Sequence, residues 1–273
     1  MMTVSSVLCK ESLQLLITIM ERTPYSSSRS NILVGITDMM NRFPNEVEPW
    51  TPHIYGRLRD ESPTVRRTCV KMLTGLIMKE MIRVKGQVSD LAVCLVDSDL
   101  NIRLETTQFF TELANKGNAL YNIIPDILSR LTVPGLGLEE DNFQEIIKFI
   151  LGLVQKEKQV DSIIEKVCVR FKLATSERQW RDLSYCLSLL KYNVKGIRRL
   201  TDSLTLMKDK IHYDPVLKVL QDIIDQAKKK PELKAACVEL EEKLEQILVG
   251  KDNEREKQPD VDTTIMPPPT RVS

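Results

Sequence analysis

The sequence predicts an all-α fold, a solenoid of stacked helix pairs, and three observations support this prediction. Apolar residues recur with a period near 3.6 along most of the 273-residue chain, and no stretch sustains a period of two. Aromatic residues make up only 5% of the chain and glycines number 10, which leaves little material for β-sandwich strands or hairpin turns. An internal shift of 37 residues aligns successive helices, as expected of a repeat protein.

The helices of the first half have recognisable start and stop residues. Apolar stripes predict helices over residues 11–22, 29–43, 63–79 and 100–116. Pro44 stops the second of these helices, and Ser62 is the N-cap of the third, followed by Pro63 at the first helical position. Gly117 closes the fourth helix just beyond its C-cap. These signals indicate helices joined by short turns.

The same pattern continues in the second half and ends before the C-terminus. Apolar stripes predict further helices over residues 141–154, 160–173, 176–190, 214–224 and 231–249. Ser176 with Gln179 forms a capping box, and Asp214 followed by Pro215 opens the next helix. We therefore expect the solenoid to occupy residues 1–249. Residues 250–273 are polar, proline-rich and aperiodic, and we expect them to form a disordered tail.

An internal repeat relates the first helix pairs to one another. The segment RLRDESPTVRRTCVKML aligns with CLVDSDLNIRLETTQFF, so Asp60 matches Asp97 and Arg66 matches Arg103 at a shift of 37 residues. Arg29 lies a further 37 residues upstream of Arg66. The aspartate can accept hydrogen bonds from free amides at a helix start, and the arginine can pair with an aspartate of the same or the next repeat. The unit resembles the HEAT repeat. The alternative is that the three arginines are equally spaced by chance.

Ordered blocks of sequence carry a more specific resemblance, which spans about residues 10–225. The blocks are RFPN…EPWTPH at 42–53, LRD…VR at 58–66, VKGQVS at 84–89, FFTELANKGNALYNIIPDILSRL at 109–131 and SERQWRDLSYCLSLL at 176–190. Their order and spacing resemble the C-terminal HEAT region of the condensin complex subunit 1 family. That family's subunits are much longer, so the chain could be a fragment, a partial gene model or a shortened paralogue.

The resemblance implies a function without chemistry of its own. It implies a non-catalytic scaffold subunit that acts in mitotic chromosome condensation, binds the kleisin and the heads of the SMC ATPases, and contacts double-stranded DNA weakly and without sequence specificity. It also implies a location in the nucleus on chromosomes, and in the cytoplasm during interphase. The alternative is a generic HEAT adaptor that binds peptides along its concave face.

Charge is balanced over the chain but concentrated locally. With 39 basic and 38 acidic residues the net charge is +1, which excludes a globally basic nucleic-acid binder. Residues 57–86, however, hold eight basic residues and three acidic ones. We take the candidate DNA-phosphate contacts to be Arg57, Arg59, Arg66, Arg67, Lys71 and Lys85. The alternatives are a solvated face with Arg66 used inside the repeat, and an ordinary helix C-terminus at Lys85-Gly86.

Residue patterns typical of enzymes and metal sites are not found. The two histidines, His53 and His212, lie far apart, and no cysteine pair has zinc-ligand spacing. Gly135 and Gly137 form a GxG that follows no strand, so a phosphate loop is not expected. We expect no cofactor, metal or small-molecule substrate. We expect the six cysteines to be buried thiols, and no apolar run is long enough to span a membrane.

Overall fold

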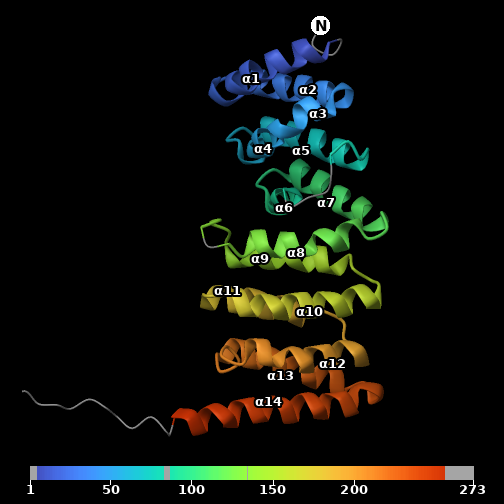
Figure 1. Ribbon diagram of the computed structural model, residues 1–273, viewed down its shortest axis with the longest axis vertical. Coiled ribbons are helices and arrows are strands. Elements are labelled where there is room, and N and C mark those ends of the chain that lie inside the picture. The colour runs from blue at the N-terminus through green and yellow to red at the C-terminus, as the bar shows by residue number, and fades with distance from the viewer. Residues whose placement is uncertain (1–4, 83–86, 134, 256–273) are drawn as a thin grey trace, which may run out of the picture.

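Helix pairs stacked in a single column form the whole described structure. The computed structural model describes residues 5–82, 87–133 and 135–255, with side chains as far as residue 249. These ranges contain helices and turns and no strand, and the pairs follow one another from α1 to α14 along the long axis (Figure 1). The predicted all-α solenoid is therefore confirmed. Within the described residues no helix is long and apolar enough to cross a membrane.

Each pair contributes one helix to each of two layers. The first helices are α1 (Ser6–Arg22), α3 (Pro44–Val47) with α4 (Thr51–Gly56), α6 (Val88–Val93), α8 (Ala119–Leu131), α10 (Glu157–Leu173), α12 (Val194–Ser203) and α14 (Lys234–Arg255). The second helices are α2 (Ser26–Arg42), α5 (Pro63–Met78), α7 (Leu100–Asn115), α9 (Glu140–Gly152), α11 (Glu177–Ser188) and α13 (Asp214–Lys228). Five 3₁₀ turns complete the column: η1 (Glu48–Trp50), η2 (Arg57–Arg59), η3 (Cys94–Val96), η4 (Leu204–Met207) and η5 (Pro231–Leu233).

The first helices are less regular than the second, and this is where the sequence prediction was incomplete. Pro44, Pro49 and Pro52 each remove a backbone donor, and the first helix of the second pair is accordingly divided into α3, η1, α4 and η2. The apolar stripes did not predict α8 or α12. At the C-terminal end α14 continues to Arg255, so the boundary predicted at residue 249 lies inside this helix. Residues 256–273, expected to form a tail, lie outside the described residues.

The turns alternate between two edges of the column. Turns from a first helix to a second helix lie on one edge, at the left of Figure 1, and turns from a second helix to the next first helix lie on the other. Several turns use the predicted chemistry. Gly117 has φ +59°, a left-handed conformation that favours glycine, and the Ser176–Gln179 capping box is present with both of its hydrogen bonds.

One continuous apolar core runs through all the pairs, from Cys9 to Leu244. Each buried leucine or isoleucine contributes about 1.5–3 kcal/mol, and the stacking of neighbouring pairs makes this core continuous. All six cysteines are buried and free, as predicted. Burial raises the pKa of Cys94 and of Cys168 to about 12. These thiols are therefore core residues with little nucleophilic character.

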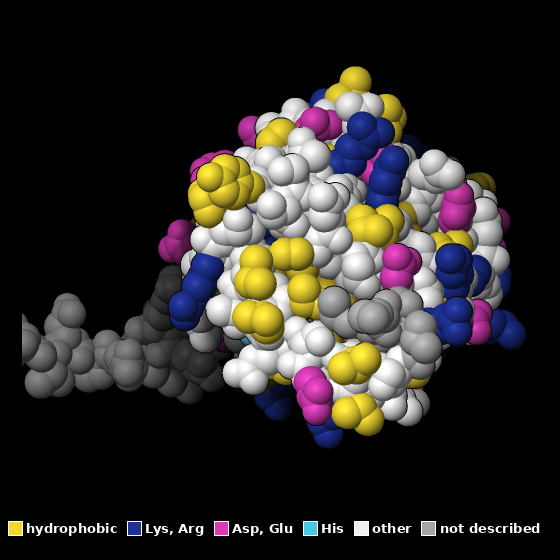
Figure 2. Space-filling model, turned by 90° about the horizontal axis from the view of Figure 1, so that it is seen from above, with side chains coloured by type: hydrophobic (Ala, Val, Ile, Leu, Met, Phe, Trp, Pro, Cys, Tyr) yellow, Lys and Arg dark blue, Asp and Glu magenta, His cyan; other side chains and the backbone are white. Residues whose placement is uncertain are grey.

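The N-terminal end of the column shows what stacking normally covers. Leu8, Leu15 and Ile19 follow one stripe of α1 and are 45%, 63% and 41% exposed. Seen from this end, hydrophobic side chains gather on the surface (Figure 2). An inner pair buries the equivalent stripe against its neighbour, so stacking rather than the isolated pair completes the core.

Candidate functional site

Three arginines occupy the same position in three successive second helices. Arg29 is the fourth residue of α2, Arg66 the fourth of α5, and Arg103 the fourth of α7. Each side chain donates from Nη1 to the backbone oxygen six residues earlier, in the turn before its helix. The three pairs are Arg29 with Thr23 at 2.9 Å, Arg66 with Asp60 at 2.9 Å and Arg103 with Asp97 at 2.6 Å. The 37-residue shift in sequence is thus a repeat in three dimensions.

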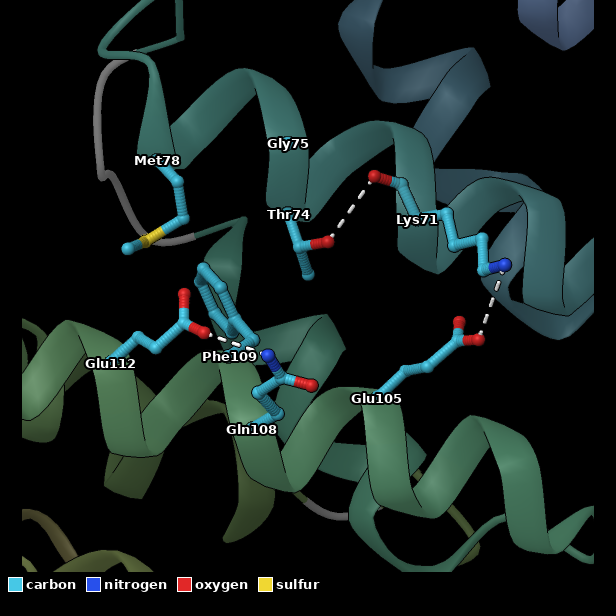
Figure 3. Close-up of a pocket in the computed structure, with 8 residues that line it drawn as sticks. All are labelled: Lys71, Thr74, Gly75, Met78, Glu105, Gln108, Phe109 and Glu112. Carbon is cyan, nitrogen blue, oxygen red and sulfur yellow. Dashed lines mark hydrogen bonds and ion pairs between the residues drawn. The ribbon is translucent and has the colours of Figure 1, made fainter.

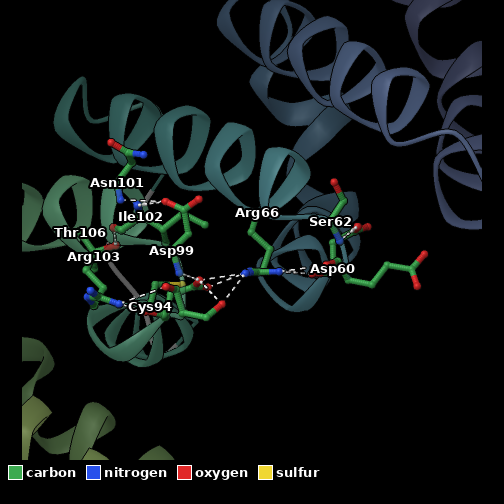
Figure 4. Close-up of polar contacts among 12 residues, drawn as sticks. Asp60, Ser62, Arg66, Cys94, Asp99, Asn101, Ile102, Arg103 and Thr106 are labelled. Atoms are coloured by element: carbon green, nitrogen blue, oxygen red, sulfur yellow. Dashed lines mark hydrogen bonds and ion pairs between the residues drawn. The ribbon is translucent and has the colours of Figure 1, made fainter.

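Two of these arginines also reach forward to the aspartate of the next repeat. Arg29 Nη2 lies 2.8 Å from Asp60 Oδ1, and both side chains are almost fully buried. Arg66 holds Asp97 with two parallel bonds, from Nε at 2.8 Å and Nη2 at 2.9 Å (Figure 4). We call this set of five residues, Arg29, Asp60, Arg66, Asp97 and Arg103, the arginine ladder. It ties the turn of one repeat to the second helix of the repeat before it.

The aspartates of the ladder also order their own turns. Asp60 Oδ1 accepts from the Ser62 amide at 3.0 Å, and Asp97 Oδ1 accepts from the Asp99 amide at 2.8 Å. Burial alone would raise the pKa of Asp97, but the hydrogen bonds from Arg66 and from the Asp99 amide outweigh it, and that pKa is lowered. Asp97 is therefore an ionised structural group at neutral pH.

The candidate phosphate contacts fall into two classes in the structure. Arg66 is only 13% exposed, and its guanidinium donates to Asp97, Ser98 and backbone oxygens, so it has no donor left for a phosphate. Arg57 lies 3.5 Å from the buried Asp60 and is 22% exposed. Both arginines therefore serve the repeat itself, as the alternative interpretation of Arg66 anticipated.

Arg59, Arg67 and Lys71 form the second, more exposed class. Arg59 is 56% exposed and lies 3.3 Å from Asp90. Arg67 and Lys71 are 43% and 52% exposed and share Glu105, at 2.9 Å and 3.5 Å. The cations are largely exposed, although Asp90 and Glu105 are each only 22% exposed. Ion pairs with an exposed cation are generally weak, about 0–1 kcal/mol, so these cations can exchange partners. We call these three residues the exposed ridge. Lys85, the remaining candidate, lies outside the described residues.

A groove between α5 and α7 begins beside the exposed ridge. It has a volume of about 410 Å³, with Lys71 and Glu105 at one end (Figure 3). Phe109 and Met78 supply apolar lining, and Gln108 donates to Glu112 at 2.8 Å on the α7 side. Both signs of charge line it, and among the described residues no three histidine, cysteine, aspartate or glutamate side chains cluster as metal ligands. The groove is thus a surface hollow with a mixed polar and apolar lining.

Of the carboxylates opposite these cations, the sequence analysis identified Asp97 but not Asp90 or Glu105. Asp90, Asp97 and Glu105 lie 31, 31 and 38 residues after Arg59, Arg66 and Arg67. They therefore fall in the next repeat, outside the 57–86 window whose charge looked unbalanced. The 37-residue shift was the available signal, because it places the next repeat's residues directly beside these arginines.

Comparisons with known proteins agree with this architecture. A family model described as non-SMC mitotic condensation complex subunit 1 matches residues 28–188. The chain is 47% identical to condensin complex subunit 1 of Xenopus laevis over 89% of its length, and 43% identical to the Homo sapiens protein over 88%. It is 39% identical to the condensin-1 complex subunit CAP-D2 of Arabidopsis thaliana over 93%. The chain spans only 17–18% of the length of these relatives.

Solved structures give a much weaker likeness. Computationally designed armadillo repeat proteins for modular peptide recognition align over 85% of this chain, at 13% identity and a TM-score of 0.35. An engineered protein aligns over the same share at 12% identity and a TM-score of 0.34. Values this low support no conclusion about function.

Proposed function

We propose a function from one premise: the chain belongs to the condensin complex subunit 1 family. Its relatives are named as subunits of a complex, and its own structure is a stacked scaffold. The chain accordingly provides a non-catalytic HEAT-repeat segment of a condensin complex. It acts in mitotic chromosome condensation, in the nucleus on chromosomes, and resides in the cytoplasm during interphase. The observation that carries this proposal is 47% identity over 89% of the chain.

Binding to the kleisin and to the SMC ATPase heads is the first part of this role. A column of stacked pairs presents long continuous surfaces, which suit extended partners. Affinity purification of a tagged chain from mitotic cells tests this directly. SMC and kleisin chains should be recovered in stoichiometric amounts. Recovery of an unrelated set of partners instead would favour the generic HEAT adaptor and contradict the proposal.

Contact with the DNA backbone is the second part, and it belongs to the exposed ridge. Arg59, Arg67 and Lys71 are 43–56% exposed, so phosphates can reach them and compete with Asp90 and Glu105, which are each 22% exposed. Each neutralised phosphate contributes about 0.9 to the slope of log affinity against log salt. The binding should be weak and independent of sequence, since phosphate contacts carry no base information.

A salt titration with a 20-base-pair duplex tests this assignment. The triple variant Arg59→Glu/Arg67→Glu/Lys71→Glu should lower the salt slope by up to about three. The control Lys148→Glu/Lys172→Glu/Lys218→Glu makes the same charge change at exposed lysines elsewhere on the surface. Equal losses in both variants would mean that only net charge matters and that the ridge is an ordinary solvated face.

A further inference from the structure

Lysines recur on one edge of the column, at turns from a second helix to the next first helix. The last five of these turns each carry at least one lysine, at intervals close to one repeat. The residues are Lys79; Lys116; Lys156 and Lys158; Lys191 and Lys195; and Lys228, Lys229, Lys230 and Lys234. We call this set the lysine edge, which runs down the right side of Figure 1 from α5 to α14.

The opposite edge carries both signs of charge. Asp60, Asp97 and Glu140 lie at its turns but pair with arginines, and Arg59 and Lys208 lie at turns of the same edge. The lysine edge itself includes Glu80, Glu157 and Glu232 beside its lysines. A partner that approaches this edge therefore meets an excess of positive charge over five successive turns.

Helix dipoles explain only part of this distribution of charge. Acidic residues at the starts of second helices and lysines at their ends are favoured by the dipole, which accounts for Glu140 and Lys79. Lys156, Lys158 and Lys195, however, lie at the starts of first helices: Lys156 is the N-cap of α10, and the other two are second residues of α10 and α12. The dipole disfavours cations there. The helix dipole therefore does not explain these three lysines.

Most lysines of this edge have no counter-ion. Within the described part of the chain, Lys116 lies 3.7 Å from Glu80 and Lys228 pairs with Glu241. The other lysines of the edge are all exposed, and no described carboxylate pairs with any of them. The edge thus offers unneutralised charge, unlike the exposed ridge, whose cations already face carboxylates.

An apolar hollow lies in the middle of the last charged stretch. It has a volume of about 180 Å³ between the ends of α11 and α13, and Lys191 and Lys230 border it. Leu190, Ile223 and Leu233 are among the side chains that line it. A phosphate cannot be desolvated in such a hollow without loss, whereas an apolar side chain gains by filling it. The surface therefore suits a protein segment better than a duplex backbone.

We propose that the lysine edge binds an extended acidic segment of a partner protein, with one apolar side chain of that segment in the hollow between Lys191 and Lys230. Stacked helices lie about 8–10 Å apart, which three residues of extended chain span. An acidic residue at about every third position would meet successive turns. This inference deepens the proposed function by giving a partner-binding surface and its chemistry, but it requires neither the kleisin nor DNA.

Fluorescence anisotropy with a labelled 16-residue glutamate-rich peptide containing one central leucine tests the proposal on the purified chain. Lys191→Glu/Lys230→Glu should weaken binding about tenfold, since two ion pairs of about 0.5–1 kcal/mol each become repulsions. The matched control Lys148→Glu/Lys218→Glu, which lies away from this edge, should change affinity less than twofold. Circular dichroism should show both variants equally folded, because the four lysines are exposed.

Two further measurements test the apolar contact and the choice between a peptide and DNA. Replacing the peptide's leucine by serine should weaken binding to the unmodified chain severalfold, because the hollow loses its occupant. Equal losses in the edge and control variants, or no effect of the serine peptide, would overturn the proposal. So would a 20-base-pair duplex that binds more tightly than the peptide and is lost on Lys191→Glu/Lys230→Glu. Copurification of condensin chains tests the proposed function independently of this peptide binding. Either the proposed function or the peptide-binding proposal can therefore be contradicted without the other.

Discussion

The first three repeats and the later pairs reach the same architecture with different polar chemistry. In the first region, α2 to α7, the arginine ladder repeats every 37 residues and links each turn to the neighbouring repeat. In the later region Arg181 of α11 takes over the linking role: it donates to Glu140 of α9 at 3.2 Å and to the Tyr213 hydroxyl before α13 at 3.0 Å. Apolar stacking continues through both, so the core specifies the column and the polar links fix its local register.

The change between the two regions is visible at single positions. Thirty-seven residues after Arg103 the sequence has Glu140, and 31 residues after it the sequence has proline rather than aspartate. The arginine ladder therefore does not continue beyond Arg103. A different interaction, between Arg178 and Asp182 within α11 at 2.9 Å, has no counterpart in the ladder. The comparison teaches that loss of sequence periodicity does not mean loss of stacking.

Breaking the ladder should have the largest effect. Asp60→Ala leaves the buried Arg29 with only the exposed Glu61, 3.6 Å away, and leaves the Ser62 amide without its acceptor. Removing one partner of a buried pair costs about 3–5 kcal/mol. Urea unfolding followed by circular dichroism should show this loss. The contrast is Glu165→Ala in the later region, whose pair with Arg199 is about half exposed, and there the loss should be about 0–1 kcal/mol. Similar losses in both variants would contradict the distinction between the regions.

Two glycines sharpen the comparison at the level of packing. A Cβ at Gly196 of α12 would lie 3.0 Å from Ile164 Cδ1 and 3.4 Å from Asp161 Oδ1, so Gly196→Ala should destabilise by about 1–3 kcal/mol. Gly35 of α2 has no atom within 4 Å of a built Cβ, and Gly35→Ala should stabilise by about 0.5–1 kcal/mol. Thermal unfolding of both variants should show shifts of opposite sign. A stabilising Gly196→Ala would show that α12 is packed more loosely than described.

The sequence predicted most of the core but not the part supplied by α8, whose Ile123 and Ile127 are buried, and it did not resolve the polar site. The reasons are physical. The 3.6-residue spacing of apolar side chains was enough to predict the long second helices, because each of these helices buries one face. The short pieces α3, α4 and α6 have too few turns to show a period. Arg66 was counted among eight basic residues because its partner Asp97 lies 31 residues away, beyond the local window. Long-range pairing therefore decides whether a basic cluster is a surface or part of the repeat.

A smaller effect on stability is expected at the turn after the second helix, where one repeat has glutamate and the next has glycine. Glu80 follows α5 with φ +60°, and Gly117, 37 residues later, follows α7 with φ +59°. A left-handed conformation costs a non-glycine residue roughly 1–2 kcal/mol. Glu80→Gly should therefore stabilise by about 1 kcal/mol, after loss of its exposed contact with Lys116. Gly117→Ala should destabilise by a similar amount. Thermal unfolding of the pair checks both, and equal signs would contradict the equivalence of the two turns.

Lowering the pH should change the local stability of the two regions differently, and this is the smallest effect that we expect. The pKa of Asp97 is lowered because its hydrogen bonds outweigh burial, so its stabilisation is present above the unfolded-state pKa, near 3.8, and is lost as pH falls through the lower folded value. Burial raises the pKa of Asp182 despite Arg178, so its contribution is fully present below the unfolded-state pKa and falls as pH rises through the folded value. Amide hydrogen exchange between about pH 5 and pH 2 should therefore show protection falling earlier in α5 and α7 than in α9 and α11. If protection falls in parallel in the two regions, these carboxylates do not control the local response to acid. In that case Asp97→Asn should leave the pH dependence of protection in α7 unchanged.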